Sequence, residues 1–318
     1  MQRMRLNSIA YAETARAQWL GLLGAAVLLG SCSGCHGIER LIVGPRVDNE
    51  HPTQLRLIWH TATEASPVSY WFGQPALDNG KLFVEDANGI PTVYAIAVAD
   101  GRLLWKKNVG QGWTFPGHVM GIGESGDTIY VNVWRFLTLN GYLSQGVLVA
   151  LDRRNGSELW RYESPDTASG FHFPPAVSGR LIVVSDLQGG RTLGLDRFTQ
   201  QLLWTVPHHT NSTPVIVGDT VFGASNDLYA WAARLSTGAL LWEKKTGGGS
   251  FFASTYCAGG VIANEGMLQR LEASSGAYTG AFNVRLDEQG IYTSALVADG
   301  TRVFFTGQGG VYAVACRP

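Results

Sequence analysis

The sequence predicts an all-β fold, a six-bladed β-propeller made of four-stranded antiparallel blades and closed by the N-terminal strand. One observation is a phrase ending in Leu-Trp, which recurs without gaps at 93–105, 148–160, 192–204 and 230–242. A second is the spacing of its tryptophans, 38 to 55 residues, without any helical period. A third is a glycine turn inside each of three copies. Repeats of this length and pattern are typical of propellers.

Each copy of the phrase reads as a strand, a turn and a second strand. Glycine suits the turn because it accepts positive φ without a steric clash. With the weaker copy at 267–280 included, the turn glycines are Gly101, Gly156, Gly238 and Gly276. We expect the tryptophans on the outer strand to pack against the neighbouring blade. They are Trp105, Trp160, Trp204 and Trp242, while the copy at 267–280 has Gly280 at that position.

A strand pair precedes the phrase and completes each four-stranded blade. The first strands are predicted to begin near Gln74, Phe115, Pro175, Pro214, Thr255 and Ser294. The last copy reaches Pro318 without a fourth strand, whereas residues 55–59 resemble a fourth strand that nothing precedes. We therefore predict that 55–61 completes the last blade. Closure of this kind removes exposed sheet edges that would otherwise invite aggregation.

Composition and charge fit a β-rich globular protein. Charged residues make up 15% of the chain, with 40 glycines and 10 tryptophans, which suits tight turns and a packed core. The formal net charge is −1. Nucleic-acid binding relies on basic surfaces that neutralise phosphates. We expect no nucleic-acid partner.

The N-terminus predicts export. Arginines precede an apolar run of about 12 residues, too short to span a bilayer comfortably and typical of a signal peptide. Leu29-Gly30-Ser31-Cys32 resembles the bacterial lipobox, which implies lipidation of Cys32. By resemblance to Gram-negative sorting, Ser33 favours the outer membrane. We predict a signal peptide at 1–31, a lipid-anchored linker at 32–53 and a propeller at 54–318. An uncleaved anchor and a plain secretory signal are the alternatives.

The four cysteines allow two further readings. Cys32-Ser33-Gly34-Cys35-His36 matches the CxxCH pattern of c-type haem attachment, but strand-like sequence resumes by Leu55 and leaves no room for a cytochrome domain. Cys257 and Cys316 are expected on different strands of adjacent blades. An exported protein could pair them, but the different strands favour two buried thiols.

The repeat L-[DE]-x-x-[TN]-G-x-x-L-W resembles the pyrroloquinoline-quinone (PQQ)-type repeat of the quinoprotein alcohol dehydrogenase-like propellers. The resemblance covers about 54–318. One branch of that family comprises quinone- and calcium-dependent dehydrogenases. The other is non-enzymatic and includes the propeller lipoprotein of the outer-membrane β-barrel assembly machinery. Both branches usually have eight blades, whereas six are counted here.

The resemblance can be tested on the residues that the dehydrogenases need. Those enzymes place a pair of adjacent cysteines over the quinone and an Asp base beside calcium. This chain has no Cys-Cys pair, and no carboxylates are spaced to hold calcium. We therefore predict no cofactor, no metal and no catalytic residues, and a scaffold or binding module for protein partners on the periplasmic side. A PQQ-dependent or otherwise catalytic propeller is the alternative.

Aromatic and histidine residues collect just before the first strand of each blade and on one long insertion. These segments share one face of a propeller with the loops between second and third strands, which also carry the acidic residues Glu85, Asp86, Asp186, Asp227 and Glu265. The predicted partner-binding ring is Trp71, Phe72, Trp113, Phe115, Trp134, Phe171, His172, Phe173, His208, His209, Phe251, Phe252 and Tyr292.

Such a ring suits a peptide strand, a glycan or a partner loop. Alternatively, the aromatics plug the channel and pack between blades. If His118 and the ring histidines converged, they could bind a metal, although the adjacent His208 and His209 could not easily ligate one ion together.

Overall fold

A computed structural model describes residues 58, 60–61, 75–86, 90–115, 117–225, 227–246, 254–264, 268–282, 296–307 and 310–316. These residues form 23 β-strands and no helix, so the predicted all-β class is confirmed. Residues 58–318 make one compact unit. Within the described ranges, no helix is long and apolar enough to cross a membrane.

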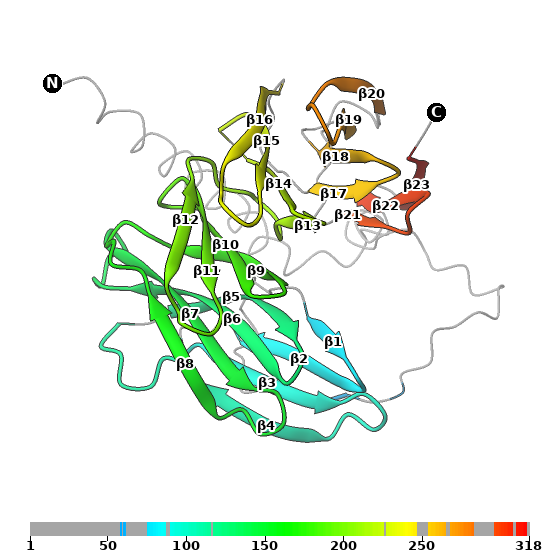
Figure 1. The fold of residues 1–318 in the computed structure, drawn as a ribbon. Coiled ribbons are helices and arrows are strands. Elements are labelled where there is room, and N and C mark those ends of the chain that lie inside the picture. The colour runs from blue at the N-terminus through cyan, green and yellow to red at the C-terminus, as the bar shows by residue number, and fades with distance from the viewer. Residues whose placement is uncertain are drawn as a thin grey trace, which may run out of the picture. The chain divides into compact units, whose positions relative to one another are not determined.

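The strands build six antiparallel sheets in chain order, called blades 1 to 6 (Figure 1). Blade 1 consists of β1 (Ala76–Asp78), β2 (Lys81–Asp86), β3 (Thr92–Ala97) and β4 (Leu103–Asn108). Blade 2 consists of β5 (Gly117–Ser125), β6 (Thr128–Phe136), β7 (Ser144–Asp152) and β8 (Glu158–Glu163). Blade 3 consists of β9 (Phe171–Ser178), β10 (Leu181–Asp186), β11 (Arg191–Asp196) and β12 (Leu202–Val206).

The last three blades follow the same order. Blade 4 consists of β13 (Val215–Val217), β14 (Thr220–Ala224), β15 (Tyr229–Arg234) and β16 (Leu240–Lys245). Blade 5 consists of β17 (Ser254–Cys257), β18 (Gly260–Asn264), β19 (Leu268–Glu272) and β20 (Tyr278–Phe282). Blade 6 consists of β21 (Leu296–Ala298), β22 (Arg302–Gly307) and β23 (Gly310–Ala315). Its described part thus has three strands, as the sequence predicted.

The blades meet through their first strands. Each first strand contacts the first strand of the next blade, from β1 and β5 through to β17 and β21. The apolar core correspondingly lies between consecutive blades, because each cluster of buried side chains draws on two of them. Sheets that pack face to face around their first strands form a propeller-like arrangement.

Three of the four repeated tryptophans fasten their blade to the next by a hydrogen bond, while Trp160 is half-buried and packs against Tyr130 of its own blade. Nε1 of Trp105 donates to the carbonyl of Arg153 at 3.1 Å. Trp204 and Trp242 repeat this bond to Leu235 and Ala273, both at 2.8 Å. All three indoles are at least nine-tenths buried, so ring and N–H are satisfied together.

The turn glycine beneath the indole is required on two grounds. Gly156, Gly238 and Gly276 have φ near +70°, where side chains are strained. A Cβ at any of them would lie 2.6 Å from the tryptophan of the preceding blade. The turn glycine and the outer tryptophan therefore fit each other across these three junctions, whereas the turn of blade 3 has Gln200 at φ 60° in place of the glycine.

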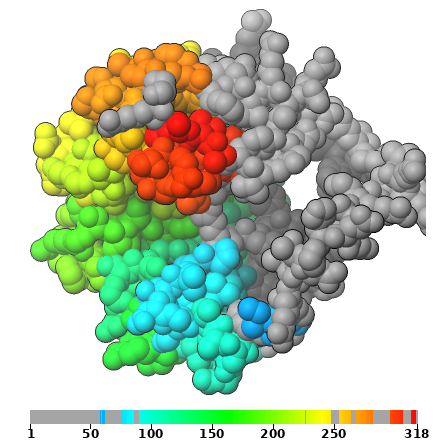
Figure 2. Space-filling view, turned by 90° about the vertical axis from the view of Figure 1, so that its right-hand side faces the viewer, coloured from blue at the N-terminus to red at the C-terminus, as the bar shows by residue number. Residues whose placement is uncertain are grey.

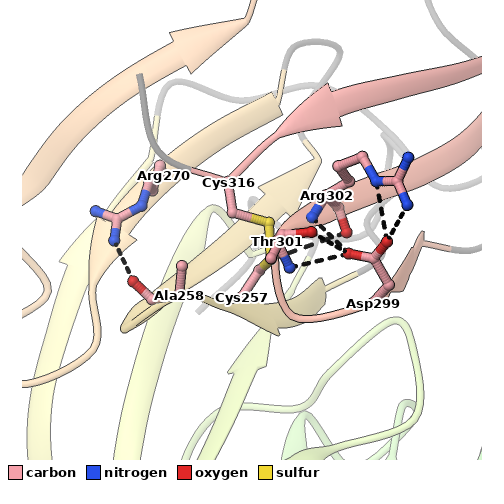
Figure 3. Close-up of a disulfide and its surroundings, with 7 residues drawn as sticks. All are labelled: Cys257, Ala258, Arg270, Asp299, Thr301, Arg302 and Cys316. Carbon is pink, nitrogen blue, oxygen red and sulfur yellow. Dashed lines mark hydrogen bonds and ion pairs between the residues drawn. A yellow bond between two sulfur atoms is a disulfide. The ribbon is translucent and has the colours of Figure 1, made fainter.

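Cys257 and Cys316 form a disulfide, so the prediction of two buried thiols is wrong. Their Cα atoms are 5.7 Å apart. Cys257 ends the first strand of blade 5, and Cys316 follows the third strand of blade 6. First and third strands of antiparallel sheets run in the same direction, so both cysteines come to the same side of neighbouring blades. Figure 3 shows them joined there.

Ring closure by the N-terminal strand falls mostly on residues outside the described ranges. Thr61 does donate its hydroxyl to the carbonyl of Gly101 in the turn after β3. Figure 2 shows the described atoms of 58–61, in blue, beside blade 1. Closure of the ring by this strand stays a prediction.

We predict that the two N-terminal truncations differ sharply in stability. Deletion of 33–60 removes the strand expected to complete blade 6 and should unfold the protein. Deletion of 33–48 removes only predicted linker and should leave the melting temperature unchanged. Circular dichroism melts of both truncations would measure this, and equal melting temperatures would contradict closure.

Candidate functional site

The hairpin of β6 and β7 is the longest in the described part of the chain. Its strands have 9 residues each, against 5 or 6 in the middle strands of the other blades. It begins at Thr128↔Asp152, the pair that matches Leu181↔Asp196 in blade 3. The additional pairs therefore lie at the loop end and lengthen the hairpin by about 10 Å.

The loop at the end of this hairpin is held by its own hydrogen bonds. The amide of Leu137 donates to the carbonyl of Leu143 at 2.9 Å, and the amide of Gly141 donates to Thr138 at 3.0 Å. The amide of Tyr142 donates to the side chain of Asn140 at 3.3 Å. The loop is thus ordered before any partner arrives.

Two large side chains at the tip are exposed. Leu139 is 88% exposed and Tyr142 is 84% exposed. Leu143 beside them is 46% exposed. Exposed apolar residues are individually common on protein surfaces, but three of them on one ordered loop make a compact apolar surface. We call Leu139, Tyr142 and Leu143 the hairpin tip.

An aromatic cluster supports the base of the hairpin. Trp134 packs edge-on against Phe136 at 4.7 Å between ring centroids, and against His172 of β9 at 5.0 Å. His118 of β5 meets Phe136 at 5.3 Å. The guanidinium of Arg135 lies 4.7 Å above the ring of Trp113, in the segment between β4 and β5. Two predicted ring residues, Trp134 and His172, therefore touch, and Trp113 joins them through Arg135.

His172 is buried in this cluster and held neutral. Burial is the main cause that lowers its pKa to about 4, and the neighbouring His209 and His118 lower it further. Among the described residues, its Nδ1 has no hydrogen-bond partner. The imidazole therefore acts as a packing group between Trp134 and Phe173.

His208 and His209 belong to the junction of blades 3 and 4. The ring nitrogens of His208 lie 3.2 Å from a carboxylate oxygen of Asp227 and 2.7 Å from one of Glu243. The carbonyl of His209 accepts a 3.0 Å bond from Nε1 of Trp231. Both histidines are more than nine-tenths buried, so neither offers a surface to a partner.

The remaining predicted ring residues divide between the core and the undescribed part of the chain. Phe171 is fully buried on β9 and stacks on Tyr162 at 6.3 Å. Phe173 has φ 65°, and its carbonyl accepts a 2.9 Å bond from Asn132. Phe115 is half-buried. The residues outside the described ranges are Trp71, Phe72, Phe251, Phe252 and Tyr292.

The acidic residue Asp186 also has a structural role. Its carboxylate is fully buried and accepts bonds from the amides of Gly170 and Gly189 at 2.8 and 3.0 Å. It also pairs with Nε of Arg191 at 3.0 Å. Among the described residues, no three His, Cys, Asp or Glu side chains gather so as to hold a metal ion.

A family model described as outer membrane protein assembly factor BamB matches residues 52–244 and 144–317. The chain belongs to this family. The resemblance to PQQ-type repeat propellers is thereby confirmed, on its assembly-factor branch. The BamB family match spans all six blades.

Two curated relatives match the chain. The outer membrane protein assembly factor BamB of Xanthomonas campestris pv. campestris is 25% identical over 208 residues, and the tetrathionate hydrolase of Acidithiobacillus ferrooxidans is 25% identical over 232 residues. These alignments cover 63% and 64% of this chain but 47% and 42% of the relatives. The chain therefore spans under half the length of the curated relatives that it matches.

Two solved structures are similar to this one. BamB from Moraxella catarrhalis has a TM-score of 0.49 at 15% identity, covering 76% of this chain and 83% of that chain. The computationally designed Ika8 protein has a TM-score of 0.50 at 13% identity, covering 77% and 83%. At such identities a structural likeness concerns the fold alone.

Sequence reasoning singled out the long insertion between the second and third strands of blade 2 but did not select its tip. Leu139 and Tyr142 lie between two predicted strands, and their apolar character gives no sign of exposure. The usable signal was the length of the insertion between the second and third strands of blade 2.

We predict that His172 makes the protein less stable in acid. Its pKa is lower in the folded state, so the unfolded state binds the extra proton between pH 6.5 and about 4, and stability falls as pH falls through that range. His172→Phe keeps an aromatic ring but cannot be protonated, so this part of the loss of stability in acid should disappear. Urea unfolding at pH 7 and 4.5 should show a drop ~2 kcal/mol larger in the natural protein than in the variant. Equal drops would show that His172 is not held neutral.

Proposed function

We propose that the protein is a non-catalytic scaffold of the bacterial cell envelope that binds protein partners in outer-membrane assembly. The observation that carries this proposal is the ordered hairpin tip, with Leu139 and Tyr142 exposed on an aromatic base. Membership of the BamB family supports the assembly role.

The tip has the physical properties of a binding loop. Its backbone bonds reduce the conformational entropy lost on binding, which otherwise opposes association. Tyrosine supplies a large apolar face with a polar hydroxyl, and such residues dominate binding energy at protein interfaces. The packed rings of Trp134 and Phe136 give the hairpin a firm base.

We predict that Tyr142→Ala weakens partner binding without unfolding the protein. A central interface tyrosine contributes about 2 kcal/mol or more, so capture should fall by more than tenfold. The melting temperature should stay the same because the side chain is exposed. The measurement is the amount of partner captured from native membranes by the natural protein and by Tyr142→Ala. Photo-crosslinking from position 142 of the otherwise natural chain then identifies the captured protein.

Tyr278, 60% exposed on β20, is the matched control position. Crosslinks from 142 to an envelope protein of the outer-membrane assembly machinery, absent from 278, are expected. No difference between the two positions would contradict the assignment of the tip.

We further propose that the protein is exported, lipidated at Cys32 and anchored to the periplasmic face of the outer membrane. The Leu29-Gly30-Ser31-Cys32 sequence supports lipidation. The Cys257–Cys316 disulfide supports export, because disulfides persist in oxidising compartments. The membrane is then the second partner, through the lipid.

Cys32→Ala should release the protein from the membrane and abolish labelling by a fatty-acid probe. Fractionation and labelling of cells that express either form would measure this. Retention of Cys32→Ala in the membrane, together with loss of haem absorbance in Cys35→Ala, would favour the CxxCH reading.

A catalytic propeller is the second candidate, and the similarity to a tetrathionate hydrolase favours it. Saturable consumption of tetrathionate by the purified protein would support that candidate. Saturable, calcium-dependent binding of pyrroloquinoline quinone would likewise support a dehydrogenase.

A further inference from the structure

The carbonyl groups that accept the indole hydrogen bonds belong to the same position of successive blades. In every blade, the residue directly after the third strand donates its amide to the turn between the first and second strands. These bonds are 2.8 to 3.1 Å long. The residues in this position are Val98, Arg153, Arg197, Leu235, Ala273 and Cys316. Cys316 in blade 6 is thus the equivalent of Ala273, which accepts the bond from Trp242.

Blade 5 offers no tryptophan to Cys316. Its outer strand has Gly280 where blade 4 has Trp242, and a Cβ at Gly280 would meet nothing within 4 Å. The disulfide from Cys257 joins the two blades at this position instead. The covalent bond ties the backbones together but does not fill the volume of an indole ring.

A cavity of about 300 Å³ lies at this junction. Strand register makes its walls equivalent to those around Trp242. In blade 4, Phe222, Ala232 and Trp242 lie side by side on the second, third and fourth strands. In blade 5, Ile262, Arg270 and Gly280 occupy the same three places. On the facing blade, Val303 pairs with Val314 as Val261 pairs with Leu271. Cavity and tryptophan site are the same place in successive junctions.

Arg270 is the charged side chain among the residues that line the cavity, beside the polar Gln269 and Thr279. Arg270 is the cross-strand partner of Gly280. In the four blades that have a tryptophan at this position, the cross-strand partner is a small residue: Ala95, Ala150, Gly194 or Ala232. Arg270 donates to the carbonyl of Ala258 at 3.0 Å and to the hydroxyl of Thr279 at 2.7 Å. Figure 3 shows the guanidinium directed toward Ala258, away from the disulfide. Cys316 lines the same cavity.

We propose that this cavity binds a tryptophan side chain supplied by a partner polypeptide. The argument for this occupant is the repeat itself, since Trp105, Trp204 and Trp242 fill the equivalent place in other junctions. Apolar side chains of the lining receive the ring, and the aliphatic stem of Arg270, whose guanidinium is held by Ala258 and Thr279, forms part of the wall. The site is distinct from the hairpin tip and goes beyond the proposed function.

The test uses the folded, oxidised full chain and the probe acetyl-Gly-Trp-Gly-amide, with acetyl-Gly-Ala-Gly-amide and free indole as comparison probes. Calorimetric titration should show saturable binding of the tryptophan peptide and none of the alanine peptide. Gly280→Trp, which supplies the ring from the chain itself, should weaken peptide binding at least tenfold. Gly280→Ala leaves the cavity open and should bind within threefold of the natural protein.

Each other outcome contradicts the proposal. Binding of indole without the peptide would identify a free small aromatic as the ligand, and binding of neither would show a cavity filled by the chain itself or by water. Should Gly280→Trp fail to fold by circular dichroism, Gly280→Leu blocks the same space. Tyr142→Ala should bind the peptide normally, so failure here is separable from failure of the hairpin tip.

Discussion

The hydrogen bond from an outer-strand indole to the next blade is the interaction on which the rest of the structure depends. Neighbouring blades pack face to face through apolar side chains, which have no directional bonds, and the indole hydrogen bond adds a directional contact at the periphery. Trp204 helps fix the rotation of one blade relative to the next by placing its ring over Gly238 and its N–H on the carbonyl of Leu235. Because that rotation sets where the loops fall, it also decides which side chains meet there, as Arg135 of β6 meets Trp113 from the segment after β4.

This interaction explains why so much of the fold could be predicted from the sequence. An indole, a turn residue at positive φ and a small residue opposite the ring recur at fixed spacing, as Trp242, Gly276 and Ala232 do. The predicted first strands of five blades accordingly begin within two residues of the observed ones, from β1 at Ala76 to β21 at Leu296. β9 is the exception: it starts at Phe171, four residues before the expected Pro175, because the strand passes through a bulge.

The candidate site was less predictable because the same residue types serve packing and binding. Phe171, His172 and His208 were grouped by their place before a strand, but burial separates them from the exposed tip. Burial depends on which neighbours arrive from other blades, and local sequence does not contain that information. The disulfide was missed for a different reason: strand direction alone brings Cys257 and Cys316 to one side, although they occupy different strands.

The contact between the outer tryptophan of one blade and the turn of the next has an evolutionary consequence. Blades 1, 3 and 4 carry an indole donor on the fourth strand and an acceptor position after the third, so a duplicate of one of these blades arrives with both halves of the contact already matched. Gain or loss of a whole unit changes the number of blades without redesigning any interface. Only junctions that have lost the donor, such as the one at Gly280, resist such exchange, because their Cys257–Cys316 bond is specific to two particular blades.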